Sequence, residues 1–164
     1  MSSVTPAPDR PHRKRIRLDP AFYRGGVQAF LVTICVVDRR PWFSQHPALA
    51  DYAATEVAAL AANRGAILHA WCVMPDHLHL LIADVDVVDF IRILKGRVAV
   101  HARRADAGRR FWQRSFHDHA PRSGEDLYCM ARYVLENPVR AGIVTTASEY
   151  RWAGSGTWVD WREW

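Results

Sequence analysis

Several features that would fix the location or fold of a protein are scarce in this sequence. No run of about eighteen apolar residues occurs and no apolar run lies near the N-terminus, which argues against a membrane span or a secretory signal. The three cysteines, Cys35, Cys72 and Cys129, form no CxxC pair. We therefore expect them to be small core residues in a reducing cytosol, rather than a disulfide framework or a zinc site. Lysine is also rare, with only Lys14 and Lys95.

The positive charge is instead carried by arginine. The chain of 164 residues has 22 basic and 17 acidic side chains and a net charge of +5. The planar guanidinium can grip a phosphate with two hydrogen bonds, so a nucleic acid is favoured as partner over a membrane surface. The alternative is a basic surface that serves only solubility. A hydrophobic fraction of 49% indicates one folded domain with a real core.

Hydrophobic periodicity predicts an α+β fold of the ferredoxin-like type, βαββαβ, with an additional C-terminal helix. The order is strand, helix, strand, strand, helix, strand and helix, at residues 29–37, 47–63, 66–74, 77–83, 87–104, 111–116 and from 123 to about 137. The last helix begins at an acidic capping box, Ser123 to Asp126. Two helices are expected to cover one sheet face and leave the other open. We divide the chain into a basic N-terminal arm (1–19), the domain (20–155) and a Trp-rich tail (156–164).

The most informative motif is His77-Leu78-His79 in the third predicted strand. Side chains alternate along a strand, so the two imidazoles share one face while Leu78 points to the other. Two histidines at this spacing on an exposed face can bind one metal ion. The similar triplet His117-Asp118-His119 lacks the central apolar residue, and we interpret it as a loop pair with a structural or substrate-contact role.

Tyrosines on or after the last predicted helix could supply a nucleophile. Tyr133 and Asn137 are four residues apart and share a helix face, although Tyr128 and Tyr150 are rivals on the same grounds. A phenol has a pKa of about 10 and needs help to attack phosphorus at neutral pH. A nearby divalent cation could offset the charge of the phosphate.

Three segments in this order resemble the single-tyrosine HUH transposases (histidine, hydrophobic residue, histidine), and within them the REP-associated tyrosine transposases. They are WCVMPDHLHLLI, RYVLENPVRAGIV and EYRWAGS, at residues 71–82, 132–144 and 149–155. The resemblance spans roughly Arg17 to Ser155. It implies a bacterial cytoplasmic, nucleoid-associated enzyme that cuts and rejoins single-stranded DNA through a 5′-phosphotyrosine.

By position, the resemblance makes Tyr133 the nucleophile and His77 and His79 ligands of Mg²⁺ or Mn²⁺. Asn137 stands where transposing relatives often carry glutamine as a further ligand, and asparagine is common there in the REP-associated branch. Relatives bind short hairpins, which implies REP-like palindromes as partners. Whether the active site is completed within one chain or across a homodimer is left open. We expect the DNA backbone to contact Arg13, Lys14, Arg15, Arg17, Arg92, Lys95 and Arg103.

Three other functions fit parts of the sequence. One is a domesticated protein that binds hairpin DNA without cutting it, and another is a metal-dependent phosphodiesterase that releases its product by hydrolysis. The third, an RNA-binding sheet, is weaker because the predicted strands lack an obvious pair of exposed stacking aromatic residues. A covalent protein–DNA adduct would distinguish the tyrosine mechanism from the first two of these, because only that mechanism yields one.

Overall fold

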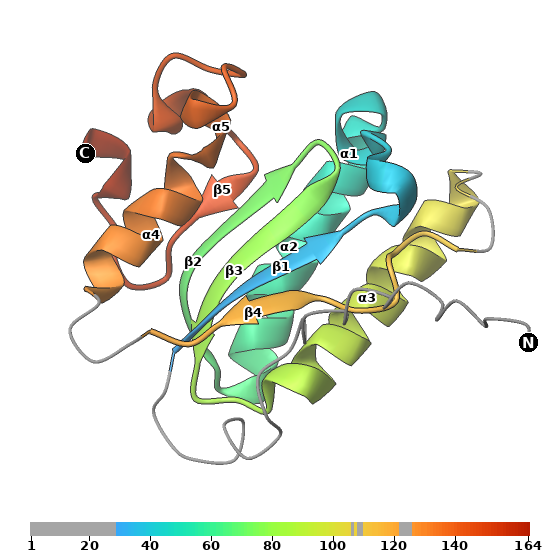
Figure 1. Cartoon of the computed structure of the whole chain (residues 1–164), viewed down its shortest axis with the longest axis horizontal. Helices are drawn as coiled ribbons and strands as arrows, with labels where there is room; N and C mark the ends of the chain where they lie inside the picture. Colours follow the sequence, from blue (N-terminus) through green and yellow to red (C-terminus); the bar gives the residue numbers. More distant parts are fainter. Residues whose placement is uncertain (1–28, 106, 108–109, 122–125) are drawn as a thin grey trace, which may run out of the picture.

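The chain folds around an antiparallel sheet with helices on both faces (Figure 1). The structure, a computed structural model, describes residues 29–105, 107, 110–121 and 126–164. In that part of the chain the sheet has five strands in the order β4-β1-β3-β2-β5. They span Phe30–Cys35 (β1), Ile67–Met74 (β2), His77–Ala83 (β3), His117–His119 (β4) and Ala153–Gly154 (β5). The order β4-β1-β3-β2 is that of the predicted ferredoxin-like fold, to which β5 adds an edge strand.

Helices connect the strands largely at the predicted positions. The short α1 (Trp42–Gln45) precedes α2 (Pro47–Arg64), and α3 spans Val87–Arg104. After β4 come α4 (Leu127–Leu135) and α5 (Asn137–Arg140). Single 3-10 turns lie at Val37–Arg39, Ala147–Glu149 and Trp161–Glu163. No helix in the described residues is long and apolar enough to cross a membrane.

Local chemistry explains where the main elements end. Helix α2 begins with Pro47 and ends at Gly65, whose φ of 65° is the left-handed conformation that glycine adopts without a Cβ clash. Strands β2 and β3 form a hairpin in which Met74 pairs with His77 across the Pro75-Asp76 turn. The cap of α4 is Asp126, whose carboxylate accepts from the Tyr128 amide, and not Ser123 as predicted. Ser123 itself lies outside the described residues.

Two hydrophobic clusters sandwich the sheet. Helices α2 and α3 cover one face, where Leu78, Leu80 and Ile82 of β3 are fully buried. The second face is not open as predicted, because α4 and the C-terminal segment pack on part of it. Ala131 and Val134 of α4 and Trp161 of the predicted tail are buried there. Figure 1 shows α4, α5 and the C-terminus gathered beside β2 and β5, away from α2 and α3.

The fourth strand lies later in the chain than predicted. Strand β4 is His117–His119, whereas the predicted strand 111–116 makes only one bridge, between Trp112 and Val36. Phe111, Trp112 and Phe116 are instead core residues of the first face, so their apolar character reflects burial rather than strand pairing. A further difference concerns the cysteines, of which Cys35 and Cys72 are buried but Cys129 is exposed.

Candidate active site

The two histidines of β3 point to the second sheet face and meet at their Nε2 atoms. These atoms, one from His77 and one from His79, are 3.0 Å apart, and the two rings are perpendicular. The prediction that both imidazoles share one face is therefore confirmed. They are not on an exposed face, however, because His79 is only 7% exposed.

Each imidazole is held through its other nitrogen. The Nδ1 of His77 lies 2.6 Å from Oδ1 of Asp76, and the Nδ1 of His79 lies 2.9 Å from the hydroxyl oxygen of Thr33. Thr33 stands opposite His79 in the pairing of β1 with β3. When Nδ1 donates in both rings, each Nε2 carries a lone pair, and the two lone pairs converge. Such outer partners fix the ring orientation and tautomer of metal-binding histidines.

Asp76 is in turn positioned by Arg39. The Nε atom of Arg39 lies 2.7 Å from Oδ2 of Asp76, and its Nη1 lies 2.9 Å from the sulfur of Cys35. Arg39 and its neighbour Asp38 both have a φ of 53°, a conformation that non-glycine residues rarely adopt. Backbone strain of this kind persists where surrounding contacts enforce it, and it is concentrated at functional sites.

The electrostatic surroundings keep both imidazoles neutral. Burial, followed by the neighbouring His77 and by Arg140, lowers the pKa of His79 to about 3. Burial also lowers the pKa of His77, while the hydrogen bond to Asp76 opposes that shift. Neutral imidazoles are the form that binds metal ions.

The geometry fits a shared divalent cation. Two ligands at right angles, each about 2.1 Å from one ion, lie about 3.0 Å apart, which is the separation of these Nε2 atoms. Nowhere in the described residues do three or more histidine, cysteine, aspartate or glutamate side chains form a candidate metal cluster. Among the described residues and a bound strand, an amide, a phenol or a phosphate oxygen could complete the set of ligands.

Tyr133 is the tyrosine that lies beside this pair. Its ring centroid is 6.1 Å from that of His79, and the side chain is 47% exposed, so it can be reached from solvent. Tyr150 is buried with its hydroxyl donating to the carbonyl of Val73, and burial raises its pKa. Tyr128 packs against Trp158 and Trp164. Of the three predicted candidates, only Tyr133 combines exposure with proximity to the histidines.

Two residues that follow Tyr133 in the chain hydrogen-bond to its main-chain carbonyl. The amide nitrogen of Asn137 donates to the main-chain carbonyl of Tyr133 over 3.2 Å. Arg140 bonds the same carbonyl and places its guanidinium carbon 4.2 Å from the centre of the Tyr133 ring. Arg140 was not among the predicted site residues, although its position seven residues after the tyrosine, at the end of α5, was a usable signal.

The second histidine triplet belongs to the same sheet face. Thr33 of β1 pairs with His79 on one side and with His117 on the other, and Leu31 pairs with Leu81 and with His119. Directly paired residues point to the same face, so His117 and His119 lie on the side of the sheet that holds His79. The prediction of a loop pair is therefore wrong about its structure, because the triplet is strand β4.

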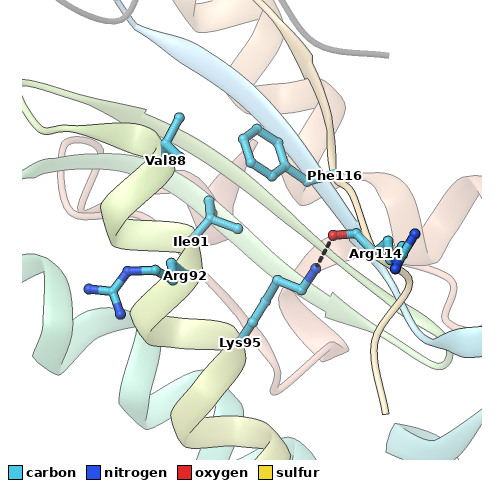
Figure 2. A pocket seen from close by; sticks show the side chains of 6 residues that line it. All are labelled: Val88, Ile91, Arg92, Lys95, Arg114 and Phe116. Atoms are coloured by element: carbon cyan, nitrogen blue, oxygen red, sulfur yellow. Dashed lines mark hydrogen bonds between the residues drawn. The ribbon is translucent and has the colours of Figure 1, made fainter. Parts of the chain in front are cut away.

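Two of the predicted DNA-contacting cations are engaged within the protein. Figure 2 shows Lys95 of α3 pointing to the main chain at Arg114, and its ammonium also donates to the carbonyl of Gln113 over 2.6 Å. Arg92 is paired with Asp89 on its own helix. Arg103 is exposed. The predicted contacts Arg13, Lys14, Arg15 and Arg17 lie outside the described residues, and all seven stay predictions.

The chain also matches a known protein family over a range that includes the histidine pair and Tyr133. The family described as "Transposase IS200 like" matches residues 28–137, a range that includes His77, His79, Tyr133 and Asn137. The structure is similar to that of a REP-associated tyrosine transposase bound to a REP hairpin. The two are 22% identical with a TM-score of 0.61, over 77% of this chain and 75% of that one.

A crystal structure of a proposed transposase from Deinococcus radiodurans R1 also matches. It is 22% identical with a TM-score of 0.49, over 66% of this chain and 88% of that one. No curated protein matches the chain.

Proposed function

This chain belongs to the IS200-like transposase family, and on that premise we propose that it cuts and rejoins single-stranded DNA with Tyr133 as nucleophile. The observation that carries the proposal is the position of an exposed tyrosine beside the buried ring of His79, whose Nε2 atom converges with that of His77. Such a pair suits a divalent cation, and a cation beside a phenol suits attack on a phosphodiester.

His77 and His79 would hold Mg²⁺ or Mn²⁺, with the side-chain carbonyl of Asn137 as a further ligand. When bound, the ion would neutralise charge on the scissile phosphate and orient it for in-line attack. Asp76 and Thr33 keep the histidine rings oriented, because each is bonded to the Nδ1 atom that faces away from the other imidazole. Arg140 lies over the tyrosine ring and can contribute positive charge close to the reacting phosphate.

The reaction conserves the energy of the bond that is broken. The phenolic oxygen of Tyr133 loses its proton and attacks phosphorus, and the bond from phosphorus to the 3′-oxygen breaks. The leaving oxygen takes up a proton and becomes a free 3′-hydroxyl, while the 5′-phosphate stays on the tyrosine. A 3′-hydroxyl, from the same strand or another, can then attack this phosphotyrosine, release Tyr133 and join the strands without ATP.

Cleavage of a hairpin pool tests the proposal. Single strands that carry a hairpin between randomised flanks are labelled at the 3′ end, because the attacked phosphate remains on the 3′ fragment. The wild-type protein with Mg²⁺ or Mn²⁺ should acquire the label in a denaturing gel. Tyr133→Phe should not, whereas the matched variant Tyr128→Phe on the same helix should. Labelling that is lost in Tyr128→Phe and retained in Tyr133→Phe would assign the nucleophile to Tyr128 instead.

The same assay separates the rival functions. Cutting without an adduct would indicate a hydrolytic phosphodiesterase, and binding without cutting would indicate a domesticated hairpin-binding protein. A chelator should abolish the adduct in the wild type, because the proposed chemistry needs the cation.

Hairpin DNA is proposed as the preferred partner. A flexible single strand can bring a phosphate into the confined space between α4 and the sheet more easily than a stiff duplex can. Gel-shift titrations should therefore rank a hairpin-bearing strand above a duplex of the same sequence, while rising salt weakens both because the contacts to phosphate are ionic. Equal affinity for hairpin, scrambled single strand and duplex at every salt concentration would contradict the preference.

A further inference from the structure

A cavity beside the tyrosine has no part in the chemistry described above. It has a volume of about 270 Å³ and lies where the start of α4 faces β1 and β4. Its described lining residues are Leu31, His119, Asp126, Cys129, Met130 and Tyr133. Because Tyr133 forms one wall and also contacts the ring of His79, whatever occupies this cavity lies next to the proposed nucleophile.

The strand register gives the distance along β1 between the histidine pair and this cavity. The row that contains His79 and Thr33 is two residues away from the row that contains Leu31 and His119. Two residues along a strand span about 6.6 Å, which is comparable with the spacing of successive phosphates in an extended single strand. A strand whose phosphate lies at the histidine pair therefore brings a neighbouring nucleotide to the cavity.

The walls of the cavity suit a flat heteroaromatic ring. Leu31, Met130 and the ring of Tyr133 offer apolar and polarisable surfaces, of the kind that stack on unpaired bases. The carboxylate of Asp126 would repel a phosphate placed in the cavity. We propose that this cavity binds the unpaired base next to the scissile phosphate, an inference that rests on the proposed function.

Asp126 determines which bases the cavity favours. Its Oδ1 accepts from the main-chain nitrogen of Tyr128 over 2.9 Å and so caps α4. Its Oδ2 is 3.9 Å from the sulfur of Cys129, a weak contact that leaves this oxygen able to accept from a ligand. Adenine, cytosine and guanine carry an exocyclic amino group that can donate to a carboxylate. The ring N–H of thymine lies between two carbonyl oxygens, which would repel a carboxylate. The cavity therefore selects a base with an exocyclic amino group.

Cys129 reports occupancy of the cavity without any need for cleavage. It is exposed, whereas Cys35 and Cys72 are buried. The full chain is treated with N-ethylmaleimide while bound to homopolymers of deoxyadenosine, deoxycytidine or thymidine, each about twenty nucleotides long to exceed a usual footprint. Fluorescence anisotropy confirms saturation, and mass spectrometry of the Cys129 peptide gives the alkylation rate.

The adenine and cytosine strands should slow alkylation of Cys129 about tenfold more than the thymine strand, the effect of one hydrogen bond to a charged group. Asp126→Asn should abolish or reverse this difference, because the amide still caps α4 but also presents a donor to the carbonyl of thymine. The matched control is Asp86→Asn, which changes the equivalent cap of α3 and should leave the preference unchanged.

Two results would overturn the inference. One is a bound strand that leaves the alkylation rate of Cys129 unchanged, and the other is equal protection by all three strands in the wild type. Failure of all strands to bind would overturn both the inference and the proposed function. Protection with the expected preference but no covalent adduct on any substrate would contradict the cleavage mechanism alone.

Discussion

The two faces of the sheet differ in chemistry although the same strands build both. On the face covered by α2 and α3, β3 contributes Leu78, Leu80 and Ile82, all fully buried in an apolar core. On the other face the same strand contributes His77 and His79, whose Nε2 atoms meet, and the ring of His79 contacts Tyr133 of α4. Because side chains alternate along a strand, successive residues of β3 belong in turn to the apolar core and to the candidate site. Substitutions on one face should change stability, and substitutions on the other should change activity.

The largest effect is expected on the histidine face. His77→Ala and His79→Ala should each lower the rate of strand cleavage by at least about a thousandfold, because either change leaves an incomplete pair of ligands for the cation. His69→Ala, on the neighbouring strand β2, is the matched control and should cut normally. Cleavage rates measured with 3′-labelled hairpin strands check this. Undiminished cutting by either variant would remove the pair from the mechanism.

The opposite face should give a large change in stability instead. Leu80→Ala removes a fully buried side chain from the first core and should lower the free energy of unfolding by about 2–5 kcal/mol. Urea denaturation followed by circular dichroism measures the loss. Below the unfolding transition, the cleavage rate per folded molecule should stay within a few-fold of the wild type. A stable Leu80→Ala variant that fails to cut would erase the distinction between the faces.

An intermediate effect is expected from the partner of His77. Asp76→Asn keeps the size of the side chain but weakens the bond to Nδ1 and removes the charge that pairs with Arg39. Loss of such an outer partner typically costs about 10–100-fold in metal affinity or activity. Titration of the cleavage rate with Mn²⁺ should therefore need more metal to reach half its maximum. An unchanged metal requirement would show that Asp76 does not position His77 for binding.

The smallest effect concerns pH. Burial lowers the pKa of His79 to about 3, from an ordinary value of 6.5. Between these values the unfolded chain binds a proton that the folded chain does not, so stability is greatest above pH 6.5 and falls as the pH falls toward 3. The slope contributed by His79 is at most about 1.4 kcal/mol per pH unit. Denaturation in chelator from about pH 7 to 5 should show a shallower slope for His79→Gln, and equal slopes would contradict the burial argument.

Local patterns were sufficient for most of the fold. The alternation of His77 to Ala83 and the helical spacing of 87–104 gave element bounds that the structure reproduces. The prediction that His77 and His79 share one face of the sheet followed from the same alternation. These features depend on residues close together in the sequence, so a single segment contains the information needed to predict them.

The errors arose where distant segments meet. Residues 111–116 have the apolar character of a strand but fill the first core, while the polar triplet at 117–119 pairs with β1. Closure of the second face depends on contacts from α4 and Trp161, more than fifty residues beyond β1. The effect of Arg140, at the end of α5, on the pKa of His79 likewise joins segments that are far apart in the sequence. No periodicity within one segment records such contacts.

The chemical identity of the protein–DNA adduct decides whether Tyr133 is the nucleophile. Wild-type protein is incubated with the hairpin pool and Mn²⁺, digested with protease and nuclease, and the modified peptide is sequenced by mass spectrometry. We expect a nucleotide joined through its 5′-phosphate to the oxygen of Tyr133, together with a free 3′-hydroxyl on the other fragment. A phosphate on another residue, a linkage through the 3′ end, or cut strands without any modified peptide would contradict it.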